Sequence, residues 1–595
     1  MSDMNINAGK VILAGASTRV NKNNLPEVTV LSSTMPAEGM HVDADEGHEA
    51  ILQTIAANGT DYIFYNGGTD IYCFVEGIAK AKALGRPSPE IITCLHESAA
   101  MAMAHGHFMV SRKPQVVMVH VDVGTQQVGG ALHNAWRGQA GVIFMAGMYD
   151  KDGAFMLEQT LDMAGIVRGY TKWEFEFYTH ENIGKVMQRA YRIANSEPCG
   201  PVYLKMPGEV LSAPMSGTTI YGPEHYAPAI SPGGDPDALR EAARCLVEAK
   251  RPLVITDTMG RHPQAVPALV KLAEKLALPV SGGRTMNFPT THPLRVSNNS
   301  PYVQSADVIL LIDADSPNGV PEDCNVISLD IDPIKLANPL WHGRINIPIQ
   351  CDSSKAIPVL TELVDDFIGK AQKQKFRERR KAMEAAYKAV RETLCTAVET
   401  ASIQLPISLT WLCYCINQIA DENTILVSDL VRQGMGQPDK AQPGSYFSEP
   451  GIHLGWAVPA AIGAKLAAPG KTVIATTGDG GFNFCVPNAC LWAARRYSIP
   501  FLTVIANNGY YLAIHDRLRR VYPNGYAVQS GDFNGAALDP MIDFALLAQS
   551  CGAYGETVMD PAILPDALQR GLDAVRSGQA AVIDVHVSLE RRFIT

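Results

Sequence analysis

The stretch Thr476–Tyr511, TTGDGGFNFCVPNACLWAARRYSIPFLTVIANNGYY, has the pattern of a strand, a glycine turn, a helix and a second strand. The apolar runs before Gly478 and at FLTVI predict two neighbouring parallel strands. Pro487 suits the first turn of the intervening helix, and the two arginines at its end suit the last turn. The stretch therefore predicts an open parallel α/β sheet.

Polar side chains follow both of these strands. Asp479 comes after the first strand and Asn508 after the second, separated by about 30 residues, the length of one crossover. We expect the two side chains to lie side by side at the carboxyl edge of the sheet, where open α/β sheets bind ligands. A carboxylate and an amide oxygen suit Mg²⁺, which also takes backbone carbonyl, water and phosphate oxygens. The stretch predicts a metal that bridges a diphosphate; the alternative is a helix cap and an asparagine turn.

The same alternation of strands and helices fills most of the chain. Short apolar runs separated by helical stretches occur at Asp61–Gly67, Glu90–Leu95, Gln115–Val121 and Gly141–Gly147. A linker rich in Gly and Pro, a second α/β unit, a charged Ala-rich helix and a third α/β unit follow. The pattern predicts three doubly wound parallel-sheet domains: an N-terminal extension at 1–40, domains at 41–216, 235–365 and 403–595, and a helical linker at 366–402.

Composition and charge restrict the class of protein. The 595 residues are 47% hydrophobic and 18% charged, which is typical of a globular enzyme, and the net charge of −10 disfavours nucleic acid or an anionic membrane as partner. No apolar run approaches the ~20 residues of a membrane span. The 12 cysteines are scattered without zinc-site spacing, so we expect free thiols and a cytoplasmic location.

The pattern GDG…NN resembles the cofactor-binding motif of the thiamine diphosphate-dependent enzymes. This resemblance implies thiamine diphosphate and Mg²⁺ as cofactors. It places the metal on Asp479, Asn508 and the backbone carbonyl of Tyr510. It also places the diphosphate against the glycines of the turn, which are Gly478, Gly480 and Gly481.

A second resemblance lies upstream, in SEPGIHLGWAVPAAIGAKLAAPGKTV, which is similar to the same region of acetolactate synthase-like enzymes. It implies that Leu454 props the two cofactor rings into a bent form. It also implies that the carbonyl of Ile452 accepts a hydrogen bond from the cofactor 4′-amino group. For Leu454 the alternative is plain packing in the core.

The segment CLHESAAMAMAHG resembles the part of the family that carries its catalytic glutamate, which falls on Glu97. An apolar environment favours the neutral form of a carboxyl group, so Glu97 could hold a proton for the pyrimidine N1′ of the cofactor. The alternative is a glutamate that caps a helix or forms a surface ion pair. The family resemblance covers most of the chain, from about Glu46 to Val587, in the order pyrimidine-binding, central and diphosphate-binding domain. It also implies a dimer or tetramer in which the glutamate of one subunit serves the cofactor of another.

The chain departs from acetolactate synthases in several places. HVDVGTQQ (His120–Gln127) replaces their Gly-Pro-Gly loop, so His120 and Asp122 could bind substrate or move a proton; satisfied core residues are the alternative. Arg432 stands near the expected diphosphate and could contact it or lie on the surface. The segment from His515 to Arg520 follows the metal motif and could face an anionic substrate or form a solvated helix face.

The arginine-rich flavin-binding stretch of acetolactate synthases is replaced by LLIDADSPNGVPEDCN, which makes bound FAD doubtful. The sequence therefore predicts an acetolactate synthase-like decarboxylase or carboligase. Such an enzyme makes or breaks a carbon–carbon bond next to a carbonyl in a 2-oxo acid or 2-hydroxy ketone. A 2-hydroxyacyl-CoA lyase and a flavin-dependent oxidase of the pyruvate oxidase type are the alternatives.

Overall fold

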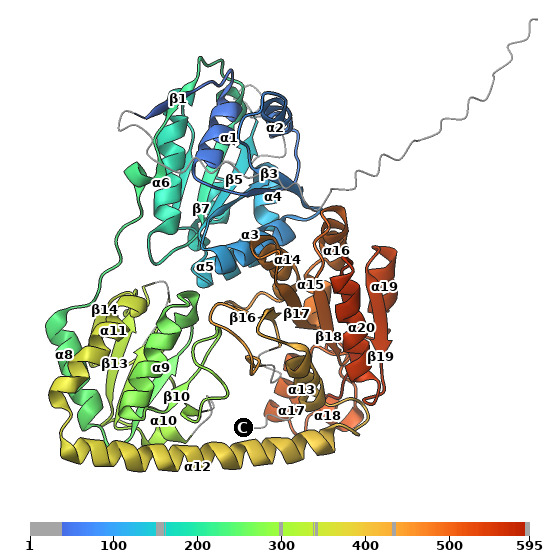
Figure 1. Cartoon of the computed structure of the whole chain (residues 1–595). Helices are drawn as coiled ribbons and strands as arrows, with labels where there is room; N and C mark the ends of the chain where they lie inside the picture. Colours follow the sequence, from blue (N-terminus) through green and yellow to red (C-terminus); the bar gives the residue numbers. More distant parts are fainter. Residues whose placement is uncertain are drawn as a thin grey trace, which may run out of the picture. The chain divides into compact units, whose positions relative to one another are not determined.

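The chain folds around three six-stranded sheets (Figure 1). The computed structural model describes residues 39–149, 160, 162–296, 301–336, 338, 343–430 and 436–589. Within these residues every strand pair of the three large sheets is parallel, as the sequence predicts. The predicted extension, residues 1–40, lies almost entirely outside the described residues.

The N-terminal sheet has the strand order β3-β2-β4-β5-β7-β6. Its strands are β2 (Tyr62–Tyr65), β3 (Glu90–Thr93), β4 (Gln115–Val119), β5 (Val142–Met148), β6 (Trp173–Glu176) and β7 (Val202–Pro207). Its helices are α1 (Gly47–Ala57), α2 (Cys73–Ala83), α3 (Glu97–Ser111), α4 (Val121–Gln127), α5 (Gly129–Arg137), α6 (Ile183–Asn195) and α7 (Gly208–Leu211). A two-stranded antiparallel ribbon of β1 (Met40–Val42) and β8 (Thr218–Ile220) accompanies it.

Both faces of the N-terminal sheet are buried, as a doubly wound fold requires. Along β4, Val117 belongs to the apolar cluster that includes Met103 of α3. Its neighbours Val116 and Met118 belong to a separate cluster that includes Leu52 of α1. Successive side chains of a strand point to opposite faces, so the uniformly apolar run of β4 packs helices on both sides.

The central sheet has the order β11-β10-β9-β12-β13-β14. Its strands are β9 (Pro252–Thr256), β10 (Val280–Ser281), β11 (Arg295–Val296), β12 (Val308–Ile312), β13 (Asn325–Asp330) and β14 (Ile347–Gln350). Its helices are α8 (Pro236–Glu248), α9 (Ala265–Leu276), α10 (Tyr302–Ser305) and α11 (Ser353–Leu363).

The C-terminal sheet has the order β16-β15-β17-β18-β20-β19. Its strands are β15 (Thr424–Ser428), β16 (Tyr446–Ser448), β17 (Thr472–Gly478), β18 (Leu502–Asn507), β19 (Tyr554–Val558) and β20 (Ala581–His586). Its helices are α13 (Leu409–Ile419), α14 (Ala457–Ala467), α15 (Asp479–Phe484), α16 (Pro487–Arg496), α17 (Leu512–Val521), α18 (Tyr526–Ser530), α19 (Phe544–Ser550) and α20 (Leu564–Arg576). The helix predicted near Pro487 is α16, but the predicted glycine turn is itself the short helix α15.

The charged helix between the central and C-terminal sheets is α12 (Lys370–Ala401), drawn in gold in Figure 1. Its basic side chains bond the carbonyl groups at the ends of two central helices. Arg379 donates to the carbonyl oxygens of Leu276 at 3.0 Å and Ala249 at 2.9 Å, and Lys375 donates to that of Val247 at 3.0 Å. Cations at a helix C-terminus satisfy unpaired carbonyls and oppose the helix dipole. The basic run of this helix therefore has a structural role.

Helices α3 and α14 pack directly against each other and join the cores of the N-terminal and C-terminal sheets into one apolar cluster. A Cβ atom on Gly106 would lie 2.0 Å from the carbonyl oxygen of Ala460, and one on Gly463 would lie 1.9 Å from that of Met103. The two glycines thus let the helix backbones touch.

We expect Gly463→Ala to destabilise the protein by about 1–3 kcal/mol, because the added methyl group would force two rigid backbones apart. The urea midpoint of unfolding should fall accordingly. Gly470→Ala is a matched control, since no atom lies within 4 Å of a Cβ built at that position. Equal midpoints for the two variants would contradict the close packing of α3 and α14.

Within the part of the chain that the structure describes, no helix combines the length and the apolar character needed to cross a bilayer.

Candidate functional site

The carboxyl edge of the C-terminal sheet brings together the polar residues that the sequence singled out. Asp479 follows β17, and Asn507 and Asn508 stand at the end of β18, which pairs with β17 in parallel. Oδ2 of Asp479 accepts a hydrogen bond from the backbone N–H of Gly509 at 2.7 Å. The crossover therefore places the Asp479 carboxylate beside the Asn507–Tyr510 turn, as expected from the spacing.

This turn is held by its own amide groups. Oδ1 of Asn508 accepts from the N–H of Tyr510 at 3.0 Å, and Oδ1 of Asn507 accepts from the N–H of Gly509 at 3.2 Å. Gly509 has φ of +68°, a conformation that glycine adopts without strain. The segment is thus a tight turn that presents amide and carbonyl oxygens next to the Asp479 carboxylate.

The electrostatic setting of Asp479 fits a cation. Its side chain is buried, and burial raises its pKa, while the backbone N–H groups of Gly480 and Gly509 act to lower it. A buried carboxylate without a positive partner is costly, and a divalent ion would remove that cost. Among the described residues no three His, Cys, Asp or Glu side chains gather as a metal cage. A metal here would therefore need amide, carbonyl and ligand oxygens besides Asp479, which is the donor set that Mg²⁺ accepts.

The glycines beside Asp479 differ in their surroundings. Gly480 and Gly481 are buried in the first turn of α15, where a Cβ on Gly481 would lie 2.4 Å from Oγ1 of Thr477. Gly478 is partly exposed, and a Cβ there would meet only one atom, at 3.9 Å. The open side of the turn is therefore at Gly478, while Gly480 and Gly481 are packed on the protein side.

A cavity of about 160 Å³ opens beside this edge. Asp479, Asn483 and Asn507 form its polar wall, and Met541 and Ile542 contribute to its apolar wall. Met541 and Ile542 are about half exposed in the single chain. The metal-type residues therefore adjoin a cavity that could receive a partly apolar ligand.

Ile452 and Leu454 lie on the segment after β16. Their side chains are 72% and 39% exposed, so packing of Leu454 in the core of this chain is excluded. Asn134 of α5 holds the segment in place, because its amide donates to the carbonyl oxygen of His453 at 2.9 Å and accepts from its N–H at 3.3 Å. The exposed Leu454 side chain is thus carried on a fixed backbone, as a prop for a cofactor would be.

A larger cavity of about 690 Å³ borders Ile452. Asp429, which follows β15, also lines it and was missed in the sequence; its position directly after an apolar strand was the available signal. Burial raises the pKa of Asp429 to about 8, and the adjacent Glu449 acts in the same direction. Asp429 can therefore hold a proton near neutral pH.

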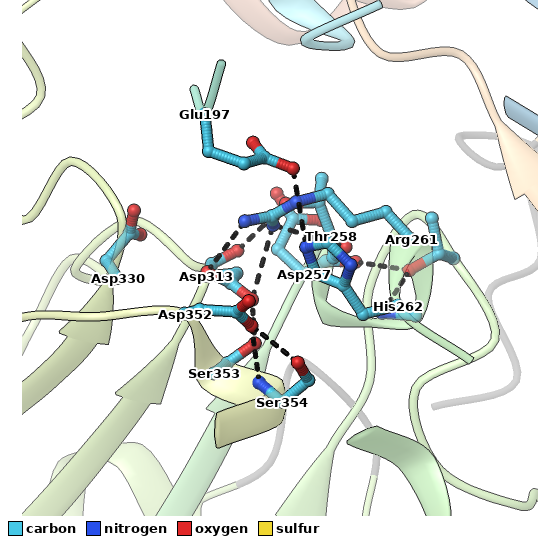
Figure 2. A network of polar contacts seen from close by, with 12 residues as sticks. Glu197, Asp257, Thr258, Arg261, His262, Asp313, Asp330, Asp352, Ser353 and Ser354 are labelled. Carbon is cyan, nitrogen blue, oxygen red and sulfur yellow. Dashed lines mark hydrogen bonds and ion pairs between the residues drawn. The ribbon is translucent and has the colours of Figure 1, made fainter. Parts of the chain in front are cut away.

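The carboxyl edge of the central sheet also faces the larger cavity, and it carries ion pairs. Figure 2 shows Arg261 beside Asp313, with two contacts of 3.2 Å, and Ser353 donates to Oδ2 of Asp313 at 2.6 Å. Glu197, from the segment before β7, reaches His262 at 3.5 Å. This is the edge at which an open sheet would bind a nucleotide. FAD stays doubtful as a cofactor, and the absorption spectrum of the purified protein is the measurement that decides it.

Glu97 is the first residue of α3, at the carboxyl edge of the N-terminal sheet. The N-cap is His96, whose Nδ1 accepts from the N–H of Ser98 at 3.2 Å, so capping is not the role of Glu97. Oε1 of Glu97 lies 3.4 Å from where a Cβ on Gly124 of α4 would stand. Among the described residues Glu97 forms no ion pair, which also disfavours the surface-pair alternative.

The loop before α4 holds a second polar group. Nδ1 of His120 and Oδ1 of Asp70 are 2.5 Å apart, although 50 positions separate them in the chain. Asp70 was missed in the sequence, and the Gly-Gly turn after β2 was the only signal for it. Asp122 is buried, and its Oδ1 has no hydrogen-bond partner among the described residues.

The two remaining candidates from the sequence are the segment that begins at His515 and the residue Arg432. His515 is buried, with its ring centroid 4.4 Å from that of Phe533 and 5.4 Å from that of Tyr510. The arginines that follow it on α17 are exposed, as the solvated-face alternative predicts. Arg432 lies outside the described residues.

The cavity beside Asp479 is not lined by Glu97. Helix α3 begins at Glu97, and the residues that follow it, Ser98 and Ala102, line a separate small cavity with Gly455 and Phe484. The N–H of Thr93 donates to Oη of Tyr497 at 2.7 Å, which ties the end of β3 to the C-terminal domain.

Comparison with known proteins agrees with this architecture. Three family models match: "Thiamine pyrophosphate enzyme, N-terminal TPP binding domain" over residues 45–166, the central domain over 239–362, and the C-terminal TPP binding domain over 434–585. The chain is 25% identical to the benzoylformate decarboxylase of Pseudomonas aeruginosa, over 89% of this chain and 97% of that protein. It is 25% identical to the acetolactate synthase of Bacillus subtilis, over 89% and 91%.

A solved structure has the same fold. The thiamine diphosphate-dependent 4-hydroxybenzoylformate decarboxylase of Rhodococcus jostii RHA1 superposes with a TM-score of 0.74 at 22% identity, covering 92% of this chain and 100% of that one. The three domain models cover both edges described above, the one with Glu97 and the one with Asp479. The chain therefore belongs to the thiamine pyrophosphate-dependent enzymes, in the acetolactate synthase-like group, and its cofactor is thiamine diphosphate.

Proposed function

We propose that this enzyme makes or breaks the carbon–carbon bond next to the carbonyl of a 2-oxo acid, as a Mg²⁺-dependent decarboxylase or carboligase. One observation carries the proposal: the buried Asp479 carboxylate lies against the Asn507–Tyr510 turn and, among the residues that the structure describes, forms no ion pair. The similarity to proteins named benzoylformate decarboxylase and acetolactate synthase supports this substrate class.

Different residues of the C-terminal domain hold different parts of the cofactor. Asp479, the amide oxygen of Asn508 and the carbonyl of Tyr510 hold the metal that neutralises the diphosphate. Gly478 leaves room at the open side of the turn, where the diphosphate approaches, next to Gly480 and Gly481. Leu454 supports the rings from its fixed segment, and the Ile452 carbonyl orients the amino group. Bound thiamine diphosphate supplies a carbon nucleophile and an electron sink.

The residues of the N-terminal sheet handle protons. Glu97 would hold a proton toward the pyrimidine N1′ of the bound cofactor. His120 exchanges a proton with the substrate, because its imidazole can act as a general acid or base. Both groups lie at helix N-termini at the carboxyl edge of one sheet, Glu97 as the first residue of α3 and His120 just before α4.

The experiment is a substrate panel of pyruvate, benzoylformate, aldehydes and 2-hydroxyacyl-CoA thioesters, followed for CO₂ and for ketone products. We expect CO₂ release from a 2-oxo acid in the presence of thiamine diphosphate and Mg²⁺. Turnover of CoA thioesters alone would instead identify a 2-hydroxyacyl-CoA lyase. A flavin spectrum together with oxygen consumption would identify an oxidase, and either result would replace the proposal.

The working unit is a dimer, with the Glu97 edge of one chain over the Asp479 edge of another. The family resemblance supports this arrangement, and Glu97 does not line the cavity beside Asp479 within a single chain. Apolar side chains also stay exposed at both edges: Leu95 and Val123 at 49% and 46%, and Ile452 and Phe484 at 72% and 47%. A second copy of the chain would cover them. The 12 cysteines are all free thiols, which supports a reducing, cytoplasmic compartment.

Mixing two inactive variants tests the shared site. Chains with Glu97→Gln and chains with Asp479→Ala are unfolded together and refolded as a mixture. We expect about a quarter of the wild-type rate, because about half of randomly formed dimers are mixed and each mixed dimer keeps one intact site. If the mixture stays as inactive as either variant alone, the catalytic residues act within one chain.

A further inference from the structure

We propose that Asp70 is a positioning residue that fixes the ring of His120 and determines which of its nitrogens carries the proton. This inference rests on the proposed function, because it concerns the proton that His120 exchanges with the substrate. It assigns a role to a carboxylate that no motif in the sequence singles out.

The contact between Asp70 and His120 is short, and only Asp70 is fully buried. Nδ1 of His120 lies 2.5 Å from Oδ1 of Asp70. The side chain of Asp70 is fully buried, whereas that of His120 is 21% exposed. The pair thus has one partner enclosed by protein and one at the surface of the carboxyl edge. A buried carboxylate can hold an exposed ring in a fixed orientation.

The second oxygen of Asp70 is also bonded. Oδ2 accepts from the backbone N–H of Val121 at 3.1 Å. Val121 has φ of +20°, an uncommon value for a β-branched residue, and it directly follows His120. The Asp70 carboxylate therefore bonds both the ring of His120 and the peptide N–H that follows it, which fixes the side chain and the backbone of this residue together.

Two glycines make room for the carboxylate. A Cβ on Gly147, in β5, would lie 2.0 Å from Oδ2 of Asp70. A Cβ on Gly68, in the loop after β2, would lie 2.4 Å from both Oδ1 of Asp70 and Nδ1 of His120. The ends of β2, β4 and β5 therefore converge on this pair, and side chains in place of either glycine would separate it.

The chemistry of the acceptors decides the tautomer. An ionised carboxylate only accepts hydrogen bonds, so Nδ1 of His120 must donate its proton to Asp70. The other nitrogen, Nε2, is then the atom that takes up and releases a proton, as in a His–Asp pair that orients a general base. The peptide N–H of Val121 is a second fixed donor. Only a carboxylate supplies an acceptor for both donors.

Two hydroxyl groups lie close to the His120 ring. The Tyr149 ring, at the end of β5, packs edge-on against His120 with centroids 6.1 Å apart. Its hydroxyl lies 3.4 Å from Oγ1 of Thr69, which precedes Asp70. Two hydroxyl groups and an imidazole therefore gather at the carboxyl ends of three adjacent strands. Such a group can bind and protonate the oxygen atoms of a 2-oxo acid.

The test is Asp70→Asn, which keeps the shape of the side chain but offers one acceptor oxygen instead of two. The fixed N–H of Val121 needs an acceptor, so the amide oxygen of the new asparagine faces Val121 and its NH₂ group faces His120. Nδ1 of His120 must then accept a hydrogen bond, which moves the imidazole proton to Nε2. We expect kcat to fall about 100-fold with KM changed little. Asp61→Asn, at the amino end of the same strand β2, is the matched control and should keep full activity.

A double-variant cycle separates positioning from mere stability. If Asp70 acts only through His120, adding Asp70→Asn to His120→Gln should lower kcat no further. Gly147→Ala provides a second variant that displaces the carboxylate without changing its charge, and kcat should fall here as well. Additive losses in the cycle, or an unchanged kcat in Asp70→Asn, would overturn the inference.

A crystal structure of the Asp70→Asn variant gives a readout besides activity. We expect the His120 ring to rotate or to occupy alternate orientations. If the wild type turns over no 2-oxo acid but the ring still moves in the variant, the proposed substrate class fails and the positioning role stands. If the wild type is active and the ring stays fixed in the variant, the positioning role fails and the proposed function stands.

Discussion

Replacing Asp479 by alanine is expected to weaken thiamine diphosphate binding by more than about 100-fold and to abolish activity. Asp479 is the only charged ligand of the proposed metal, and the other donors are neutral amide and carbonyl oxygens. Without the carboxylate, a divalent ion would have to lose water in exchange for weak ligands, which Mg²⁺ resists. Quenching of tryptophan fluorescence by the cofactor, at saturating Mg²⁺, measures the affinity.

The stability of the Asp479→Ala protein without cofactor should change little. The substitution removes a buried charge, which is favourable, but leaves the N–H groups of Gly480 and Gly509 without an acceptor, which is unfavourable. Asp543→Ala is the control: it also removes a carboxylate from this domain, at the exposed N-cap of α19, and should keep full affinity. Equal cofactor affinities for the two variants would refute the metal site.

Replacing Glu97 by glutamine is expected to slow exchange of the cofactor C2 proton by about 100-fold or more, while cofactor affinity stays within a few-fold. The amide has nearly the same size but cannot pass a proton to the pyrimidine ring. Exchange into deuterium oxide, followed by proton NMR after acid quench, measures this step without any substrate. The result therefore does not depend on which 2-oxo acid the enzyme uses.

Glu90→Gln is the matched control for Glu97. Glu90 lies at the amino end of β3, the strand that leads to α3, and its side chain is exposed. Its exchange rate should equal that of the wild type. A Glu97→Gln protein that exchanges at the wild-type rate would show that another group activates the cofactor, and the assignment of Glu97 would be withdrawn.

The local features of this protein could be predicted because they depend on residues close in sequence. The spacing between Asp479 and Asn508 equals one strand–helix–strand crossover, and a crossover in a parallel sheet returns the chain to the same edge. The apolar runs that became β4 and β18 are buried on both faces, so they read as strands without any alignment. The short helix α15 was missed, because two glycines in a row favour a turn by local propensity alone.

The pairings between distant segments could not be predicted. Asp70 and His120 meet because β2 and β4 are neighbours in the sheet, and nothing near either residue encodes that contact. The capping of the Leu276 carbonyl by Arg379 likewise joins residues 103 positions apart. Such contacts depend on strand order and helix packing, which result from burial of apolar surface across the whole domain.

The sequence by itself determined the parallel α/β class, through short-range periodicity. Spacing along one crossover predicted that Asp479 and Asn508 lie together as a metal pair, and the family resemblance supplied the cofactor motif and the role proposed for Glu97. Only the tertiary structure decided that α3 and α14 join the cores of the N-terminal and C-terminal sheets, because their contact depends on glycines that let distant backbones touch. It also decided that Asp70 is the partner of His120, since only the packed sheet brings the ends of their strands together.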